Sequence, residues 1–134
     1  MKKQVLFLCT HNSARSQMAE GLLNAFHGEL YEGYSAGVTP TEVNPYVIKA
    51  MAEIGIDISG NRSKRIEEFR GTTFNYVVTV CDSAKEACPF FPGEKVIHKA
   101  FHDPNQFTGS EEEIMKGVRR VRKEIKEWIK KTFA

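Results

Sequence analysis

The stretch VLFLCTHNSARSQMAEG, residues 5–21, decides the fold that we expect for this chain. It begins with an unbroken apolar run at residues 5–8, which is typical of a strand buried on both faces of a parallel sheet. From Ser16 to about Phe26, apolar side chains recur with helical spacing. The thiol of Cys9 follows the apolar run directly. The pattern therefore predicts a strand, a short loop that begins with a cysteine, and a helix.

The same alternation continues along the rest of the chain. Asn44 and Pro45 favour a helix start, because they pair an N-cap with a proline at the first helical position, and Ser110 with Glu113 forms a capping box. The predicted elements are strands at 5–8, 30–36, 76–80 and 94–100, and helices at 16–26, 45–54, 62–69 and from 111 to beyond 128. We therefore expect one α/β domain over residues 1–134: an open four-stranded parallel sheet flanked by helices on both faces.

Composition excludes several classes of protein. The chain has 134 residues, enough for one hydrophobic core, and its 19 Lys+Arg against 17 Asp+Glu give a net charge of only +2. The basic run at residues 119–131 is expected on the solvated face of the last helix. The apolar run near the start spans about five residues, whereas the apolar region of a signal peptide needs about 7–15. We expect a cytoplasmic monomer without a nucleic-acid or membrane partner.

The three cysteines, Cys9, Cys81 and Cys88, narrow the choice further. An odd number does not suit a secreted disulfide scaffold, in which the cysteines normally pair. A zinc site would combine Cys81 and Cys88 with His98 and His102, but the six residues between the two cysteines are too many for a usual zinc knuckle. We expect no metal. Reactive thiols and buried apolar fillers remain as alternatives for Cys81 and Cys88.

The loop after the first strand has the composition of an oxyanion site. Ligands of parallel α/β sheets bind beyond the carboxyl ends of the strands, and the N–H groups of such a loop, together with the helix N-terminus, attract anions. Cys9 would be the nucleophile, favoured as a thiolate by these donors and by Arg15, whose planar fork matches two oxygens of a tetrahedral anion. Asn12 tolerates left-handed backbone, and Ser16 can donate to the thiolate. The predicted oxyanion-binding residues are Thr10, His11, Asn12, Ser13, Ala14, Arg15 and Ser16.

The stretch CTHNSARSQMAEG resembles the signature loop of the low-molecular-weight protein tyrosine phosphatase superfamily. Within this superfamily it is most similar to the thioredoxin-coupled arsenate reductases. The likeness extends over essentially the whole chain, including YSAG at 34–37, NP at 44–45, VVTVCDSA at 77–84 and DP at 103–104. The resemblance implies the fold of low-molecular-weight tyrosine phosphatases.

The resemblance also implies a relay of three thiols. Cys9 would attack arsenate, and one oxygen would leave as water. Cys81 would then attack Cys9 and release arsenite, and Cys88 would attack Cys81. The resulting disulfide would be reduced by thioredoxin, the electron donor, so no bound cofactor is expected, and phosphate or sulfate would compete with arsenate. If residues 82–88 are helical, the helical rise between Cys81 and Cys88 is about 10 Å, whereas the Cα atoms of a disulfide lie at most about 7 Å apart. The segment would therefore have to unwind before the two cysteines could pair.

Further roles follow from the same resemblance. Asp103, before Pro104, matches the family's general acid, although Asp-Pro by itself indicates only a turn. Some of these reductases bind potassium near the loop, and the matching positions here include Asn12, Glu20 and Ser35. Lys64 stands where an acidic residue is expected. We predict that its ammonium pairs with Glu20 in place of the ion, and that the protein needs no potassium.

Two other functions remain as alternatives. A protein tyrosine phosphatase would use Cys9, Arg15 and Asp103, with the other two cysteines protecting the nucleophile, and weak phosphatase activity is compatible with reduction. A non-catalytic module would only bind an oxyanion or sense redox state. Many tyrosine phosphatases of the family have a second loop cysteine where Ala14 stands, and a tyrosine pair often follows Asp-Pro. Residues 103–109, DPNQFTG, lack that pair, and both absences favour the reductase.

Overall fold

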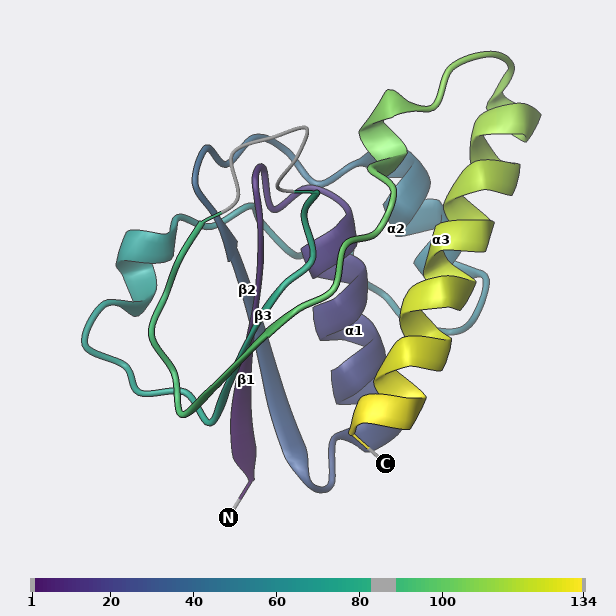
Figure 1. The fold of residues 1–134 in the computed structure, drawn as a ribbon. Coiled ribbons are helices and arrows are strands. Elements are labelled where there is room, and N and C mark those ends of the chain that lie inside the picture. The colour runs from purple at the N-terminus through teal and green to yellow at the C-terminus, as the bar shows by residue number, and fades with distance from the viewer. Residues whose placement is uncertain (1, 83–88, 134) are drawn as a thin grey trace.

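The computed structural model describes residues 2–82 and 89–133. Four strands form one parallel sheet in the order β2-β1-β3-β4 (Figure 1). The elements are β1 (Lys3–Cys9), α1 (Arg15–His27), β2 (Tyr31–Gly37), α2 (Pro45–Ala52), the 3-10 helix η1 (Ile66–Phe69), β3 (Tyr76–Thr79), β4 (Lys95–His98), the 3-10 helix η2 (Pro104–Gln106) and α3 (Glu111–Thr132). The predicted α/β fold with a four-stranded parallel sheet is confirmed.

Strand β1 lies in the middle of the sheet, which explains its unbroken apolar run. Its residues 5–8 are fully buried, because β2 and β3 pair with its two edges and both faces are covered. The register aligns Cys9 with Gly37 of β2 and Leu8 with Thr79 of β3. The carboxyl ends of three parallel strands therefore meet at one edge of the sheet, at the start of the loop that follows Cys9.

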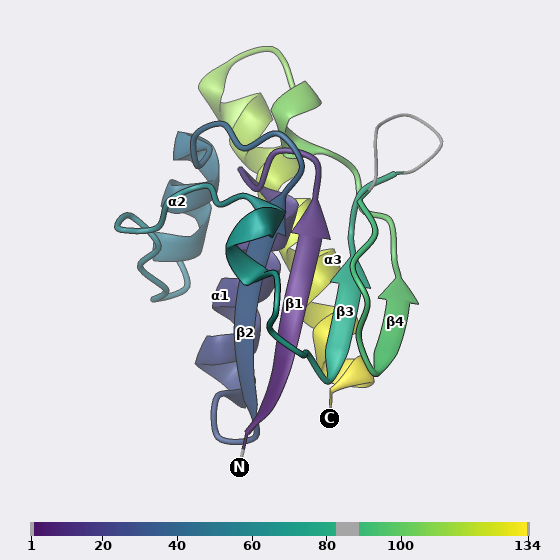
Figure 2. The ribbon, with the colours of Figure 1, turned by 90° about the vertical axis from the view of Figure 1, so that its left-hand side faces the viewer.

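The two faces of the sheet are covered differently. Helices α1, α2 and α3 lie on one face, whereas η1 lies on the other (Figures 1 and 2). On the η1 side, Tyr34, Phe69, Phe74 and Phe91 form edge-to-face aromatic pairs with ring centroids 5.8–5.9 Å apart. Both faces are covered as predicted, but among the described residues the second face is covered by aromatic side chains, loops and one short 3-10 helix rather than by an α-helix.

The predicted helix at residues 62–69 is largely wrong. Only Ile66–Phe69 is helical, and it forms a single 3-10 turn. The backbone N–H of Lys64 donates to Asn12 Oδ1 at 2.8 Å, and its carbonyl accepts from Gly37 N at 2.8 Å. These tertiary bonds occupy the backbone groups that a helix would use, so this segment is extended where it passes the loop.

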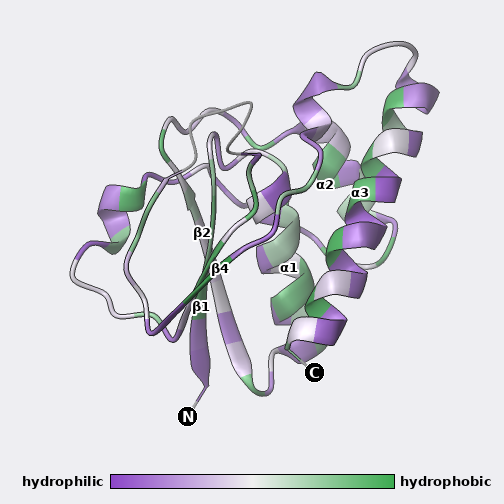
Figure 3. Ribbon diagram, viewed as in Figure 1, coloured by the Kyte–Doolittle hydropathy of each residue, from purple (hydrophilic) through white to green (hydrophobic). Residues whose placement is uncertain are grey.

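Helix α3 closes the helical face of the sheet. It begins with the predicted capping box of Ser110 and Glu113, and hydrophobic and hydrophilic residues alternate along its ribbon (Figure 3). Part of its basic run contacts the end of α2: Arg119 and Arg122 pair with Glu53 at 2.6 and 3.0 Å. Among the described residues, no helix combines the length and apolar character needed to cross a bilayer.

Candidate active site

The sulfur of Cys9 lies inside the loop that follows β1, which we call the anion loop (residues 9–16). Cys9 is a free thiol with only 1% of its surface exposed. Its Sγ accepts a hydrogen bond from Asn12 N at 3.2 Å and lies 2.9 Å from Ser16 Oγ. Asn12 Nδ2 donates to Ser16 Oγ at 2.8 Å, so the hydroxyl hydrogen of Ser16 is free to donate to the sulfur. The predicted contact of Ser16 with Cys9 is present.

The carbonyl groups of residues 10–13 all accept hydrogen bonds from outside the anion loop. Three donors belong to the connection between β2 and α2, and one to the segment before η1. The pairs are Thr39 N to Thr10 O (2.9 Å), Thr41 N to His11 O (3.2 Å), Ser63 Oγ to Asn12 O (2.8 Å) and Asn44 N to Ser13 O (2.9 Å). These bonds hold the loop backbone in shape without any contribution from a ligand.

Asn12 is the residue that shapes the anion loop. Its φ of 50° lies in the left-handed region, as predicted, and its side chain is fully buried. Its Oδ1 accepts from Lys64 N at 2.8 Å and from Gln17 Nε2 at 3.0 Å. Behind the loop, a Cβ on Gly37 would lie 2.8–3.0 Å from backbone atoms of residues 10–12, so only glycine allows this close approach.

Arg15 and Asp103 meet beside the anion loop, although 88 positions separate them in the sequence. The Arg15 side chain is only 2% exposed, and its Nη1 donates to the carbonyl of Phe101 at 3.3 Å. Its Nη2 lies 3.6 Å from Asp103 Oδ2. Asp103 also accepts at Oδ1 from Asn105 N at 2.9 Å, which caps η2. The fold therefore brings the two predicted charged groups together at one edge of the sheet.

Glu20, Ser35 and Lys64 form a cluster next to this loop. Ser35 Oγ donates to Glu20 Oε1 at 2.9 Å, and Lys64 Nζ lies 3.8 Å from Glu20 Oε1 and 3.5 Å from Ser35 Oγ. Burial raises the pKa of Glu20, and the Lys64 charge and the Ser35 hydroxyl oppose that rise. The predicted pairing of Lys64 with Glu20 is present in the structure. The absence of a potassium requirement stays a prediction.

Cys81 follows the strand next to the one that Cys9 ends. It is fully buried and disulfide-bonded. Val80 N donates to Leu8 O at 2.9 Å, so the pairing of β1 with β3 continues up to the residue before each cysteine. The two residues therefore leave the sheet at the same edge, as predicted. Cys88 lies outside the described residues, and so does almost all of the segment expected to unwind.

The histidines of the zinc alternative have other contacts. His98 Nδ1 is hydrogen-bonded to Thr79 Oγ1 at 2.6 Å, and the ring of His102 stacks on Phe107 with centroids 4.9 Å apart. Within residues 2–82 and 89–133, no group of three or more His, Cys, Asp or Glu side chains is placed to hold a metal ion. Cys88, the remaining ligand of the zinc alternative, lies outside these residues.

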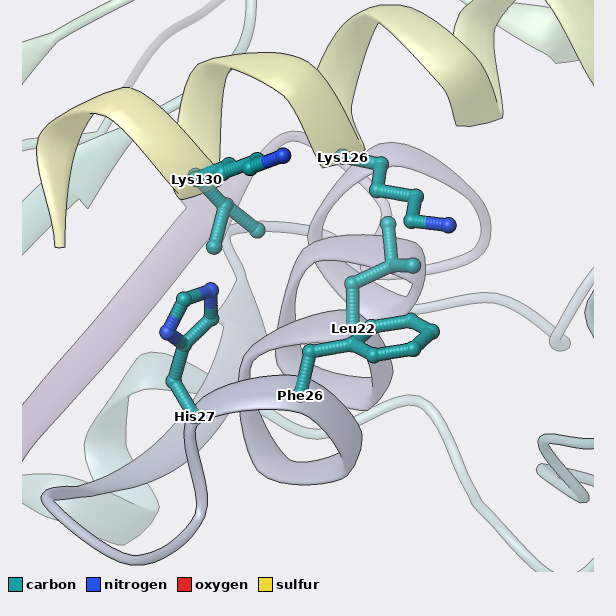
Figure 4. Close-up of a pocket in the computed structure, with 6 residues that line it drawn as sticks. Leu22, Phe26, His27, Lys126 and Lys130 are labelled. Atoms are coloured by element: carbon teal, nitrogen blue, oxygen red, sulfur yellow. The ribbon is translucent and has the colours of Figure 1, made fainter. Parts of the chain in front are cut away.

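A separate hollow of about 260 Å³ lies between α1 and α3 (Figure 4). Its lining residues are Leu22, Phe26, His27, Lys126, Ile129 and Lys130. Lys126 Nζ lies 4.6 Å from the centroid of the Phe26 ring and covers it. Three of these residues belong to the C-terminal half of α1 and three to α3, whereas the anion loop lies at the N-terminal end of α1. The hollow therefore has no part in the chemistry of Cys9.

Three polar side chains that support the anion loop are not identifiable from the sequence. Gln17 donates to Asn12 and to the carbonyl of Arg62, and Ser63 donates to Asn12 O. Asn105 Nδ2 donates to Ser13 Oγ at 2.6 Å. Ser63 and Asn105 are distant in the sequence from the residues that they contact. Gln17 contacts Asn12, only five residues away, across an irregular loop. A local pattern of apolar and polar residues carries no signal for such contacts.

Comparison with known proteins places the chain in a family. The family model described as low molecular weight phosphotyrosine protein phosphatase matches residues 4–134. A relative named arsenate reductase, from Halalkalibacterium halodurans, is 46% identical over 134 residues, which cover 99% of this chain and 96% of the relative.

Two solved structures extend the comparison. One, described as an arsenate reductase in the phosphate binding state, is 31% identical with a TM-score of 0.81, covering 96% of this chain and 95% of that one. The other, the thioredoxin-dependent arsenate reductase Cg_ArsC1' of Corynebacterium glutamicum, is 30% identical with a TM-score of 0.68, covering 97% of this chain and 61% of that one. The resemblance inferred from the anion loop is confirmed. The chain belongs to the low molecular weight phosphotyrosine protein phosphatase family.

Proposed function

We propose that this protein reduces arsenate to arsenite with Cys9, Cys81 and Cys88, and that thioredoxin returns it to the reduced state. One observation carries the proposal: Cys9 is the last residue of β1, and Cys81 follows the adjacent parallel strand β3 at the same edge of the sheet. A phosphatase needs only the first of these thiols. A reductase needs a second thiol near the first, because two electrons must reach the arsenic.

The anion loop is the proposed arsenate site. The carbonyls of residues 10–13 are bonded to groups outside the loop. The anion would be bound by N–H groups of the loop and by the N-terminus of α1. Arg15 supplies the matching charge and two parallel donors. The similar arsenate reductase solved in a phosphate binding state supports an oxyanion in this position. Phosphate and sulfate share the geometry of arsenate and would compete with it.

The first chemical step forms a bond between Cys9 Sγ and arsenic. Asn12 N donates to this sulfur at 3.2 Å, and the hydroxyl oxygen of Ser16 lies 2.9 Å from it. As the S–As bond forms, one As–O bond breaks, and Asp103 donates a proton to the departing oxygen, which leaves as water. Asp103 lies 3.6 Å from Arg15, the residue proposed to bind the same anion.

The second step transfers the electrons. The Cys81 thiolate attacks Cys9 Sγ, an S–S bond forms, and the S–As bond breaks. Its electron pair stays on arsenic, which leaves as arsenite. Cys88 then attacks Cys81 and displaces the Cys9 thiolate, and thioredoxin reduces the Cys81–Cys88 disulfide. Two findings support the relay: Cys81 is disulfide-bonded, and the chain is similar to a thioredoxin-dependent arsenate reductase.

The test is NADPH oxidation coupled through thioredoxin reductase and thioredoxin, with arsenate as the last acceptor. We expect sustained turnover in the wild type and none in Cys81→Ser or Cys88→Ser. A reaction without arsenate measures the background, and a reaction in which phosphate replaces arsenate shows that the oxidation needs a reducible anion. Full activity in either variant would refute the relay.

Phosphatase activity is the second candidate, because the family description names it and because Cys9, Arg15 and Asp103 would suffice for it. Hydrolysis of p-nitrophenyl phosphate measures this activity directly. A phosphatase keeps its rate in Cys81→Ser and loses it in Cys9→Ser. If the wild type hydrolyses the ester rapidly and gives no arsenate-dependent turnover, the phosphatase is the correct assignment.

A further inference from the structure

We propose that Asn105 is a positioning residue, which holds the loop that carries Asp103 against the anion loop. The inference rests on the proposed function, because it assigns Asp103 the role of acid. Asn105 belongs to η2, two residues after Asp103, and its side chain reaches Ser13 in the anion loop. Among the described residues, this is the only side-chain hydrogen bond from η2 to that loop.

Asn105 makes three hydrogen bonds, each to a different segment. Its Nδ2 donates to Ser13 Oγ at 2.6 Å, and its Oδ1 accepts from Asn44 Nδ2 at 2.7 Å. Its backbone N donates to Asp103 Oδ1 at 2.9 Å. Asn44 is the N-cap of α2, and its own backbone N donates to Ser13 O at 2.9 Å. Asn105 therefore connects the acid, the anion loop and the start of α2.

A backbone N–H group determines which atom is the donor and which the acceptor in each of the side-chain hydrogen bonds. Tyr46 N donates to Asn44 Oδ1 at 2.8 Å, so the amide group of Asn44 must face Asn105. Asn105 then has to present its oxygen to Asn44 and its amide group to Ser13. The hydroxyl of Ser13 acts as the acceptor, and its hydrogen is not used by Asn105. A side chain without both a donor and an acceptor cannot replace Asn105 here.

The position of the acid relative to the bound anion is what this arrangement controls. Asp103 is attached to the turn of η2, whose Pro104 is buried. The side chain of Asn105 ties that same turn to Ser13. Without it, the Asp103 carboxyl would sample a wider range of positions above the anion loop. Because proton transfer needs close geometry, the loss falls on kcat rather than on anion binding.

The test compares Asn105→Ala with Gln106→Ala, which removes an exposed amide from the same turn with no described side-chain contact. Both are measured in the wild type and in Asp103→Asn. We expect Asn105→Ala to lower kcat for arsenate about tenfold, because the acid is less well positioned, and to leave phosphate affinity unchanged. In Asp103→Asn it should lower kcat less than twofold, because there is no acid left to position. Gln106→Ala should match its parent in both backgrounds.

A second measurement needs no substrate. Hydrogen exchange of the backbone amide at position 105, which donates to Asp103, should become several-fold faster in Asn105→Ala than in Gln106→Ala, after correction for sequence effects. Unchanged exchange overturns the inference, and so does an equal loss of kcat with and without Asp103. An inactive wild type with faster exchange in Asn105→Ala overturns the proposed function but keeps the connection made by Asn105.

Discussion

The anion loop is held from two sides, and the two sides differ in burial. We call Asn12, Gln17, Ser63 and Lys64 the inner support, and Ser13, Asn44 and Asn105 the outer latch. Asn12 and Gln17 are fully buried, and the Asn12 side chain bonds to backbone and side-chain groups of the inner support. In the outer latch, Ser13 is buried, but Asn105 is exposed and its hydrogen bond to Asn44 is exposed to water.

Because of this difference in burial, we expect the two sides to have different roles. A buried group that loses its partner costs about 1–3 kcal/mol, whereas water replaces an exposed partner and the net loss is about 0.5–1.5 kcal/mol. The inner support should therefore determine whether the anion loop forms at all. The outer latch should affect how well Asp103 is placed over a loop that is already formed.

The largest effect is expected for the inner support at Asn12. Asn12→Ala removes the buried amide and puts a Cβ residue without a polar side chain at a positive φ, so we expect a loss of about 3 kcal/mol in unfolding free energy. Arsenate turnover should fall at least about 100-fold. Asn12→Gly keeps the backbone angle and loses only the amide. It should recover part of the stability but little activity, as measured by urea unfolding and the coupled assay.

A smaller loss is expected at Asp103, next to the outer latch. Asp103→Asn keeps the shape and the acceptor for Asn105 N but cannot supply a proton, so kcat should fall about 100-fold, the lower end of the usual range for a lost acid. Phosphate affinity and thermal stability should change little. An undiminished rate removes Asp103 from the mechanism.

Lys64 tests the inner support through pH. Burial raises the pKa of Glu20 above its ordinary value of 4.5, so Glu20 favours the folded state below pH 4.5 and this stability is lost as pH rises through its folded pKa. Lys64 opposes the rise. Lys64→Gln should therefore cost little below pH 4.5 and about 1–2 kcal/mol near neutral pH.

Two matched controls test this prediction. Lys64→Arg keeps the charge and should keep the stability. The double variant Glu20→Gln, Lys64→Gln lacks the carboxyl, so the effect of Lys64→Gln on stability should no longer depend on pH. Chemical unfolding between pH 4 and 8 provides the readout. In the wild type, arsenate turnover should be the same in sodium and potassium buffers, because the ammonium of Lys64 already lies beside Glu20. Strong activation by potassium would contradict this account of Lys64.

The smallest effect is expected for Asn44 in the outer latch. Asn44→Ala removes the side-chain cap of α2 and the partner of Asn105, but its backbone bond to Ser13 remains. We expect a stability loss of about 1 kcal/mol, typical of an N-cap. Activity should fall only a few-fold, as measured in the coupled assay. A loss as large as that of Asn12→Ala would remove the distinction between the two sides.

The sequence was sufficient to predict the elements whose cause is local. The apolar run of β1, the capping box at Ser110 and the left-handed Asn12 all follow from side-chain type and spacing. The composition of residues 62–65 permits a helix, but the structure shows none there. Hydrogen bonds of Lys64 to Asn12 and Gly37 determine their path, and these bonds exist only after the sheet has formed.

The same reason limits what the sequence says about the site. Cys9 and Arg15 stand in one short loop, so their spacing predicts a shared site. Asp103 was assigned through resemblance alone, since its approach to Arg15 depends on the whole fold. Asn105 gave no signal, because an asparagine after Asp-Pro is ordinary turn composition.

The most direct test of the central claim is a single turnover of Cys88→Ser with arsenate in the absence of thioredoxin, followed by peptide mass spectrometry under non-reducing conditions. The account predicts one Cys9–Cys81 disulfide and one arsenite per chain, and then no further reaction. Free Cys9 after arsenite has formed, or continued turnover without Cys88, would contradict it.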